Sequence, residues 1–377
     1  MTNSLVQSDI DVAFAPLVEE LLNGGAFEDD DVQIAAYVGS QLVIDIAIGQ
    51  VERDSLLIPY SVSKNAIAIS IGLLLERRQI DLDAAVAEYW PEFAAGDKDR
   101  VTVRQLLSHQ AGLPQAVPLL SHDEMGNTIR AAAVLAEQRP LWRPGAAFGY
   151  HGVSIGVLAS ELVRRITGLT LAEFFEREIR APRGIDFFLG LPKALEPRAV
   201  DLLPSAPIAA MTEVPFPRLE GQLGRYTFGS IAAPKTEDQR RELQRRDRAV
   251  GQPAIGASVS ARGIAALFAE AVVGVSKTPL LSSDTVEQMA QTQVVGTDEV
   301  IGIQRRYGIV FQKPAPNLVF GGFRAFGHDG AGGALGYHDP ETQISFGYTV
   351  RRTPPPGGAD ARALRIAQAM RSIVLKA

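Results

Sequence analysis

The sequence predicts an α+β fold: one antiparallel sheet built from both ends of the chain, helices that flank it, and an α-helical lobe inserted between the two halves. Two observations predict this class. β-rich runs stand at residues 32–50 and again from about residue 306, and the stretch between them has helical periodicity with Gly and Pro punctuation. Because each layer buries an apolar face against its neighbour, strands from distant parts of a chain can share one sheet.

This order of elements also predicts where the chain divides. We expect residues 1–80 and 255–377 to form the sheet domain. Residues 81–254 form a mainly helical lobe with a segment that covers a pocket. A length of 377 residues allows two or three units at ~150 residues each, or one large unit with two lobes.

The first elements are an N-terminal helix, a hairpin and a second helix. Residues 9–25 have the spacing of an amphipathic helix that ends at a Gly-Gly pair, and Pro16 fits only in its first turn. Within 32–50, two β-rich runs flank Gly39-Ser40, which predicts a hairpin. An apolar helix is expected over about residues 61–78.

The middle of the chain is predicted to be helical. VTVRQLL, VSIGVLASELVRRIT and LAEFFEREIRA have helical patterns, and each is followed by Gly or Pro. KTEDQRRELQRRDR alternates both signs of charge, which is typical of a solvated or covering helix rather than of a patch that binds nucleic acid. ARGIAALFAEAV predicts one more helix.

The last third returns to strands. RYGIVFQK, AFGHDGAGGALGYHD and QISFGYTVRR are short strand candidates joined by Gly-rich turns. A helix is expected over residues 358–375, where it would cover the sheet.

Composition excludes several classes of protein. Hydrophobic residues make up 46% and charged residues 21%, which is near the globular average and excludes a mainly disordered chain. A net charge of −6 argues against a nucleic-acid partner. The longest apolar run, residues 66–75, is too short to span a bilayer. The first residues lack a basic and an apolar signal region, so we expect a cytoplasmic protein with no membrane partner.

The residue inventory also limits the chemistry. The chain has no cysteine, which excludes disulfides, thiolate nucleophiles and cysteine-based metal sites. Its five histidines show no metal-ligand spacing, so neither a metal nor another cofactor is expected.

The strongest chemical signal is Ser61 with Lys64, at the start of the apolar helix. A separation of three places both side chains on one helical face, with Cβ atoms ~5–6 Å apart. The first turn of a helix favours negative charge, which suits a serine that becomes an alkoxide. Lys64 can act as its base if burial lowers the lysine pKa towards ~7–8. An ordinary surface helix with a capping serine and a solvated lysine has the same spacing.

Two further segments carry candidate residues. In WRPGAAFGYHG, Trp142 and Tyr150 flank a Pro-Gly turn, and Tyr150 stands just before a helix. In GHDGAGG, the glycines after His328 indicate a backbone that another group approaches closely. The simpler interpretations are a tyrosine that packs at a helix entry and a plain β-turn with an exposed histidine.

Taken in order, these segments resemble the serine β-lactamase and penicillin-binding superfamily, and most closely its class C β-lactamase-like branch, the family VIII carboxylesterases. The resemblance rests on SVSK, LLSHQAGLP, PG followed by tyrosine, and GHDGAGGALGYHD. It extends over roughly residues 30 to 350. It implies the β-lactamase/transpeptidase-like fold and a serine hydrolase that acts through an acyl-enzyme.

The resemblance also implies roles for individual residues. Ser61 would be the nucleophile, Lys64 its proton acceptor, and Tyr150 the group that shares the base role and passes a proton to the leaving group. The strand motif that begins at His328 would bind substrate through His328 and Gly330, and Trp142 would line the same site. The oxyanion hole would be the N–H of Ser61 and of Ala331.

Two departures from the family pattern bear on the substrate. Family β-lactamases usually have asparagine two residues after the tyrosine, where this chain has Gly152, and lysine where it has His328. Both changes count against antibiotic hydrolysis more than against acyl transfer. Arg351 and Arg352 follow the last strand candidate and could supply the missing cation.

Two local patterns imitate other motifs. Residues 152–156 match G-x-S-x-G, the nucleophile elbow of α/β-hydrolases, with Ser154 as nucleophile and His328 or His338 as a triad partner. The residues before Ser154 make a poor buried strand, which the elbow requires. Lys277-Thr278-Pro279 imitates Lys-Thr-Gly, but proline lacks the N–H that an edge strand needs there.

The sequence therefore predicts a serine hydrolase that cleaves small-molecule carboxylic esters through an acyl-enzyme on Ser61. Four alternatives remain: an amidase or D-peptidase, a β-lactamase of the same fold, an acyltransferase, and a ligand-binding relative that acylates without turnover. The sequence does not determine the oligomeric state, the natural substrate or its stereochemistry.

Overall fold

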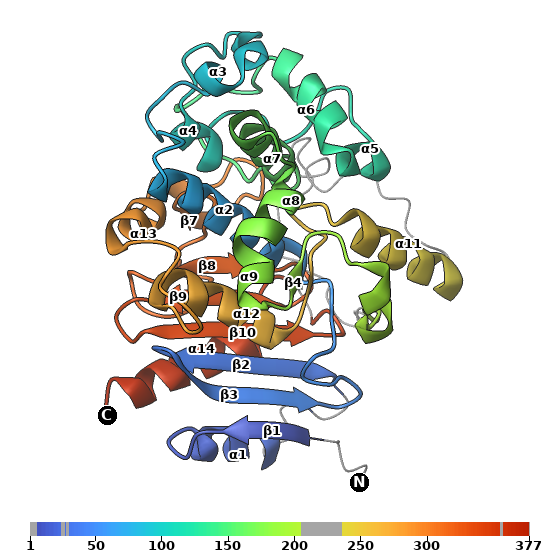
Figure 1. The fold of residues 1–377 in the computed structure, drawn as a ribbon, viewed down its shortest axis with the longest axis vertical. Coiled ribbons are helices and arrows are strands. Elements are labelled where there is room, and N and C mark those ends of the chain that lie inside the picture. Colours follow the sequence, from blue (N-terminus) through green and yellow to red (C-terminus); the bar gives the residue numbers. More distant parts are fainter. Residues whose placement is uncertain (1–5, 24–26, 28–29, 205–235, 355–356, 377) are drawn as a thin grey trace.

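The central element of the computed structural model is a six-stranded antiparallel sheet (Figure 1). The structure describes residues 6–23, 27, 30–204, 236–354 and 357–376. The strands lie in the order β1-β3-β2-β10-β9-β8, so that the N-terminal strands join the C-terminal ones between β2 and β10. Their bounds are β1 Val6–Ile10, β2 Val32–Val38, β3 Gln41–Ile48, β8 Phe326–Asp329, β9 Leu335–Asp339 and β10 Ile344–Val350.

The predicted hairpin and the predicted sheet are both confirmed. β2 and β3 pair antiparallel around Gly39, whose φ of 58° is the left-handed conformation that glycine adopts at little cost. The register between the chain ends sets Ala35 opposite Gly347. A sheet formed from both ends of the chain is the arrangement that the separated β-rich runs indicate.

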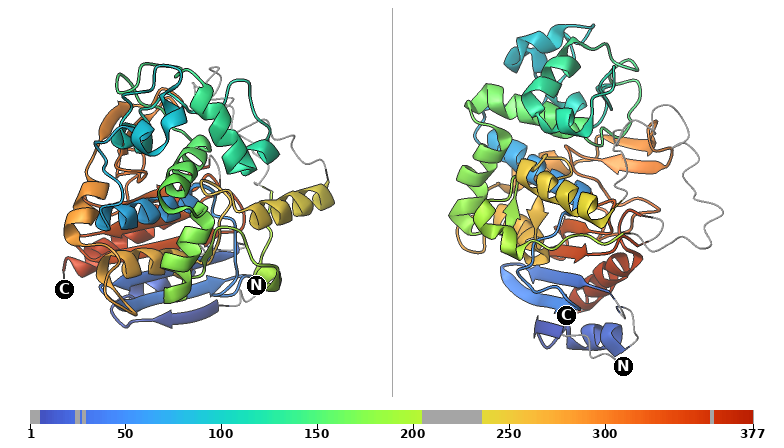
Figure 2. Two further views of the ribbon diagram at one scale, coloured as in Figure 1. Left: turned by 45° about the horizontal axis from the view of Figure 1, so that its top comes forward. Right: turned by 90° about the vertical axis from the view of Figure 1, so that its right-hand side faces the viewer.

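Helices cover both faces of this sheet (Figure 2). α1 (Ala15–Asn23) and α14 (Ala361–Val374) contribute to one apolar core with β2, β3, β9 and β10. α12 (Ala261–Phe268) packs on the opposite face, against β2 and β10. Gly347 permits this contact, because a Cβ there would lie 2.0 Å from the Ala261 carbonyl oxygen.

A helical lobe lies beyond α12, and α2 (Lys64–Glu76) runs between the lobe and the sheet (Figures 1 and 2). One apolar core joins α2, the lobe and the strand β8. α2 is apolar around most of its circumference because it is buried on all sides. The lobe helices are α3 Val86–Tyr89, α4 Val103–Leu107, α5 His122–Gly126, α6 Thr128–Glu137, α7 Ser154–Thr167, α8 Leu171–Phe175 and α9 Ala181–Arg183.

The remaining elements connect the lobe to the sheet. β4 pairs with β5 and β6 with β7 in two small sheets, while α11 stands at the edge of the molecule. Their bounds are β4 Phe187–Phe188, α11 Glu237–Val250, β5 Ser258–Val259, α13 Ser283–Ala290, β6 Val294–Thr297 and β7 Gln304–Tyr307. None of the described helices combines the length and the apolar character that a membrane span requires.

Two expected elements differ in detail. The helix expected from residue 9 begins at Ala15, with Pro16 in its first turn, because residues 6–10 pair with β3 as an edge strand. The segment RYGIVFQK contains the end of β7, which pairs with β6, and Gln312, which pairs with Gly327 of β8 at the edge of the main sheet. The first difference arises because β1 pairs with a strand more distant in the chain. The division into a domain of 1–80 and 255–377 and a lobe of 81–254 stays a prediction.

Candidate active site

Ser61 lies in a short 3₁₀ turn, Tyr60–Ser63, that leads directly into α2. Ser61 is only 5% exposed to solvent. Tyr60, the preceding residue, has a φ of 49°, a conformation that costs a bulky side chain about 1–3 kcal/mol. This strained conformation lies directly before Ser61, in the turn that leads into α2.

Lys64 is fully buried one helical turn after Ser61. Its Nζ lies 3.0 Å from Ser61 Oγ and donates a 2.9 Å hydrogen bond to the Ala254 carbonyl oxygen. Burial lowers the pKa of Lys64 well below its ordinary value, although the negative charge of Asp329 acts in the opposite direction. The lysine is therefore set up to be a neutral amine within reach of the serine hydroxyl.

Tyr150 approaches Ser61 from the lobe. Its Oη donates a 2.7 Å hydrogen bond to Ser61 Oγ, and Lys64 Nζ lies 5.0 Å from the centre of its ring. Burial is the main cause that raises the pKa of Tyr150 far above the ordinary value of tyrosine. The phenol is therefore protonated. It can donate its proton only if it receives another proton at the same time.

A buried carboxylate holds Tyr150 in place. The Tyr150 N–H donates to Asp298 Oδ1 at 3.0 Å, and the Tyr307 hydroxyl donates to Asp298 Oδ2 at 3.1 Å. The rings of Tyr307 and Tyr150 are nearly parallel, with 6.2 Å between their centres. The backbone N–H groups of Val300 and Ile301 also donate to Asp298. This network fixes both the backbone and the ring of Tyr150.

The strand motif lies on the other side of Ser61. A Cβ on Gly330 would lie 2.1 Å from the Pro59 carbonyl oxygen, so only glycine permits the β8 end to approach the serine turn this closely. Ala331 follows in the same turn. His328 is buried, and its Nδ1 lies 2.7 Å from the Asp329 carbonyl oxygen. Burial is the main cause that lowers the pKa of His328 well below that of a free histidine.

Trp142 lies farther back, in an apolar cluster with Phe148, Tyr150 and Tyr307. Its ring meets the ring of His151 edge-on, with 5.9 Å between the centres. The buried Nε1 of Trp142 has no hydrogen-bond partner in the described part of the chain. The structure thus places Trp142 behind Tyr150, and its role in binding stays a prediction.

The alternative nucleophile is absent from this arrangement. Ser154 is fully buried, and its hydroxyl donates to the Leu113 carbonyl oxygen at 2.7 Å. No strand precedes it, as the nucleophile elbow would require. His338 lies 2.9 Å from the Ser345 hydroxyl instead. Over the described ranges, no three His, Asp or Glu side chains are grouped as metal ligands would be.

Several residues that shape this site belong to no recognisable motif of the sequence. Asp298, Tyr307 and Ala254 hold Tyr150 or Lys64, and no motif points to them. Arg305 acts on Tyr150 and His328 through its charge, which lowers the pKa of both. The two arginines proposed as replacement cations are engaged elsewhere: Arg351 Nη1 lies 2.9 Å from Asp31 Oδ2, and Arg352 Nη1 donates to the Pro204 carbonyl oxygen.

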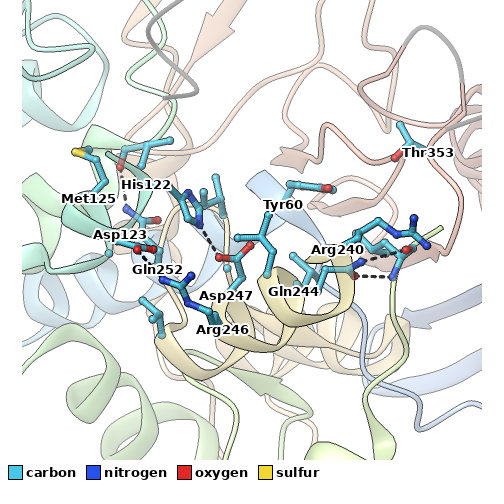
Figure 3. Close-up of a pocket in the computed structure, with 18 of the residues that line it drawn as sticks. Tyr60, His122, Asp123, Met125, Arg240, Gln244, Arg246, Asp247, Gln252 and Thr353 are labelled. Carbon is cyan, nitrogen blue, oxygen red and sulfur yellow. Dashed lines mark hydrogen bonds and ion pairs between the residues drawn. The ribbon is translucent and has the colours of Figure 1, made fainter. Parts of the chain in front are cut away.

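A cavity of about 500 Å³ adjoins the site (Figure 3). Tyr60 and Gln252 form the wall nearest to the nucleophile. The side-chain amide of Gln252 donates to the Val153 carbonyl oxygen and accepts from Ala254, the residue whose carbonyl binds Lys64. The cavity and the buried lysine therefore share one supporting segment.

Comparisons with known proteins show which sequences and structures this chain is similar to. The family model described as Beta-lactamase matches residues 25–371. The solved structure of EstA from Arthrobacter nitroguajacolicus Rue61a is 36% identical, with a TM-score of 0.89 over 98% of this chain and 99% of that one. A solved family VIII carboxylesterase is 28% identical, with a TM-score of 0.85 over 98% of this chain and all of that one (100%). Esterase/beta-lactamase LipL from Mycobacterium tuberculosis (strain ATCC 25618 / H37Rv) is 29% identical over 352 residues, which are 86% of this chain and 77% of LipL.

Proposed function

Because this chain belongs to the Beta-lactamase family and is a serine hydrolase of the carboxylesterase type, we propose that it cleaves carboxylic esters through an acyl-enzyme on Ser61. One observation supports the assignment of the nucleophile. Ser61 Oγ lies 2.7 Å from Tyr150 Oη and 3.0 Å from Lys64 Nζ, in a place that is almost closed to water. An activated serine needs a base within this distance.

In the acylation step, the neutral amine of Lys64 acts as base and the protonated phenol of Tyr150 acts as acid. Ser61 Oγ attacks the ester carbonyl carbon while its proton passes to the neutral amine of Lys64. The bond to the alcohol then breaks. The departing oxygen takes the proton of Tyr150, and Tyr150 takes the extra proton of Lys64. The alcohol leaves neutral, and both bases return to their starting states.

Deacylation reverses this transfer with water in place of the alcohol. Water attacks the acyl carbon and gives a proton to the pair formed by Lys64 and Tyr150. That proton then returns to Ser61 Oγ as the acid leaves. In both steps the N–H groups of Ser61 and Ala331 would bind the negative oxygen, which the close approach of the β8 end to the serine turn supports.

The nucleophile can be tested against the alternative serine. We expect Ser61→Ala to reduce ester hydrolysis by about 10⁴-fold or more, because no covalent intermediate can form. Ser154→Ala should keep most of the activity. Both rates are measured with p-nitrophenyl butyrate on samples whose melting curves match the wild type. Loss of activity in Ser154→Ala together with full activity in Ser61→Ala would overturn the mechanism.

The departures in the strand motif predict esters over β-lactams. A β-lactam carries a carboxylate beside its scissile amide. Here His328 is neutral, the carboxylate of Asp329 adjoins it, and Gly152 offers no side chain. We expect kcat/KM for p-nitrophenyl butyrate to exceed that for nitrocefin by about a hundredfold or more. The reason is that the carboxylate of the β-lactam would be buried without a cationic partner. A higher value for nitrocefin would contradict the esterase proposal.

A further inference from the structure

His109 is a fully buried histidine beside Tyr150, and the acylation cycle described above gives it no role. It lies in the turn that follows α4. The centre of its ring is 5.4 Å from that of Tyr150 and 4.4 Å from that of Tyr307. Its φ of 64° is the left-handed conformation, which is uncommon for a residue other than glycine. Residues held in such conformations cluster at functional sites, so the contacts of His109 bear on function.

His109 binds the backbone on both sides of Tyr150. Its carbonyl oxygen accepts a 3.0 Å hydrogen bond from the Gly149 N–H. Its ring Nδ1 accepts a 3.1 Å hydrogen bond from the His151 N–H. The N–H between these two belongs to Tyr150 and donates to Asp298 Oδ1. Three consecutive N–H groups are thus fixed, the outer two by His109 and the middle one by Asp298.

The contact with His151 also defines the proton of the His109 ring. Because a backbone N–H donates to Nδ1, that nitrogen carries no proton, and a neutral ring then has its proton on Nε2. Burial is the main cause that lowers the pKa of His109 well below that of a free histidine. Nε2 has no hydrogen-bond partner in the part of the chain that the structure describes. The ring therefore holds its neighbours through Nδ1, as a neutral acceptor.

Tyr150 needs this support because no regular element holds it. It stands in an irregular stretch before α7, where neither helical nor sheet hydrogen bonds fix the backbone. Its hydroxyl must nevertheless stay at 2.7 Å from Ser61 Oγ. A displacement of ~1 Å at a catalytic group can cost ~10²-fold in rate. Contacts with the neighbouring backbone therefore decide how accurately the hydroxyl is placed.

We propose that His109 is a positioning residue of the ester reaction, which fixes the backbone around Tyr150 and thereby the distance from Tyr150 Oη to Ser61 Oγ. The inference rests on the proposed esterase function and adds a residue that acts through Tyr150 without touching the substrate. Tyr150 transfers a proton in the chemical step. Loss of the ring acceptor should therefore lower kcat and leave KM nearly unchanged.

Three substitutions separate the acceptor from backbone strain and from size. Asparagine tolerates a positive φ and offers Oδ1 as an acceptor near the place of Nδ1. Glycine tolerates the same φ, and leucine keeps a side chain that branches at the same atom as asparagine; the two share only the loss of the acceptor. We expect His109→Asn to keep kcat for p-nitrophenyl butyrate within about threefold of wild type. His109→Gly and His109→Leu should each lower kcat by about tenfold or more, with KM within about threefold.

The results of these variants decide the proposal. An equal loss in all three, or no loss in His109→Gly and His109→Leu, would overturn it. If the wild type itself hydrolyses no p-nitrophenyl ester, the proposed function fails; if it does and the glycine and leucine variants match it, only this inference fails. Melting curves show which variants fold, and either glycine or leucine is enough for the comparison.

The Tyr150→Phe background tests through which residue His109 acts. Without the hydroxyl, the exact position of the ring matters little for proton transfer, so His109→Gly there should lower the remaining kcat by less than about threefold. A further loss of about tenfold or more would overturn the proposal, because the histidine would then support the site in general. His338→Gly is the control: it removes an equally buried ring that bonds Ser345 within the sheet, and it should keep kcat within about threefold. A loss there as large as in His109→Gly would also count against the proposal.

The wild-type protein supplies a measurement that needs no folded variant. In nitrogen NMR spectra of histidine-labelled protein, the signals of His109 should show the proton on Nε2 and a bare, hydrogen-bonded Nδ1. A proton on Nδ1 would overturn the proposal, because the ring could then not accept from the His151 N–H.

Discussion

Lys64 and Tyr150 reach their working protonation states for the same reason. Both are buried, and burial disfavours the charged form of each: it lowers the pKa of the lysine and raises the pKa of the tyrosine. Burial therefore favours a neutral amine beside a neutral phenol, and both groups lie within hydrogen-bond distance of Ser61 Oγ. A proton can move between Lys64 and Tyr150 so that a separated pair of buried charges exists only briefly.

This shared relay predicts that the two residues act as a unit. We expect Lys64→Ala and Tyr150→Phe each to reduce kcat for p-nitrophenyl butyrate by about 10³-fold or more, and the double variant to lose little beyond either one. Steady-state kinetics on the three variants, with melting curves to check folding, measure this. If the two losses multiply in the double variant, the residues do not share one proton-transfer role.

At the scale of elements, the pairing of α5 with α11 depends on pH. The hydrogen bond to Asp247 is the main cause that raises the pKa of His122, and the charges of Asp247 and Asp123 add to it, while burial and Arg246 oppose it. A raised pKa in the folded state means that this contact stabilises the protein fully below about pH 6.5, the ordinary histidine value. The contribution is lost as pH rises through the higher folded pKa.

Asp247→Asn tests this dependence. We expect the variant to be less stable than wild type by about 1 kcal/mol or more near pH 6, because a charged hydrogen bond is lost, and the difference to shrink as pH rises to 9. Urea unfolding at several pH values measures it. Asp238→Asn, at an exposed position of α11, is the control and should show a difference that does not vary with pH. A constant difference for Asp247→Asn would contradict the raised pKa of His122.

At the scale of the whole molecule, two glycines bring the sheet and the active site together. Gly336 on β9 and Gly347 on β10 lie opposite each other and face α12. A Cβ on Gly336 would lie 2.4 Å from Ile264 Cγ2, and one on Gly347 would lie 2.0 Å from the Ala261 carbonyl oxygen. α12 can therefore lie close on the sheet, which places the segment before it, including Ala254, against Lys64.

Enlarging Gly347 should disturb this contact in proportion to size. We expect Gly347→Ala to destabilise the protein by about 1–3 kcal/mol and Gly347→Val by more, because α12 must move off the sheet. Both variants should also lower ester turnover through the displaced Ala254 carbonyl. Thermal melting and kinetics together measure the two effects. Wild-type stability in Gly347→Val would show that α12 adapts without cost.

The parts of the fold and of the site that have a local signal can be predicted from the amino-acid sequence alone. The hairpin follows from β-rich runs around Gly39, the buried helix from its apolar run, and the pairing of Ser61 with Lys64 from helical geometry. The family and the sheet shared by both chain ends follow from the order of motifs. Each of these inferences needs only a short segment of neighbouring residues, or the order of several such segments along the chain.

The other features of the site depend on contacts that form only when the chain folds. Asp298 holds Tyr150 from 148 residues away, and Ala254 binds Lys64 from 190 residues away, so no local pattern could reveal either contact. The neutral state of His328 and the lowered pKa of Lys64 depend on desolvation by all surrounding groups together. The cavity exists because α5, α11 and Tyr60 meet in space.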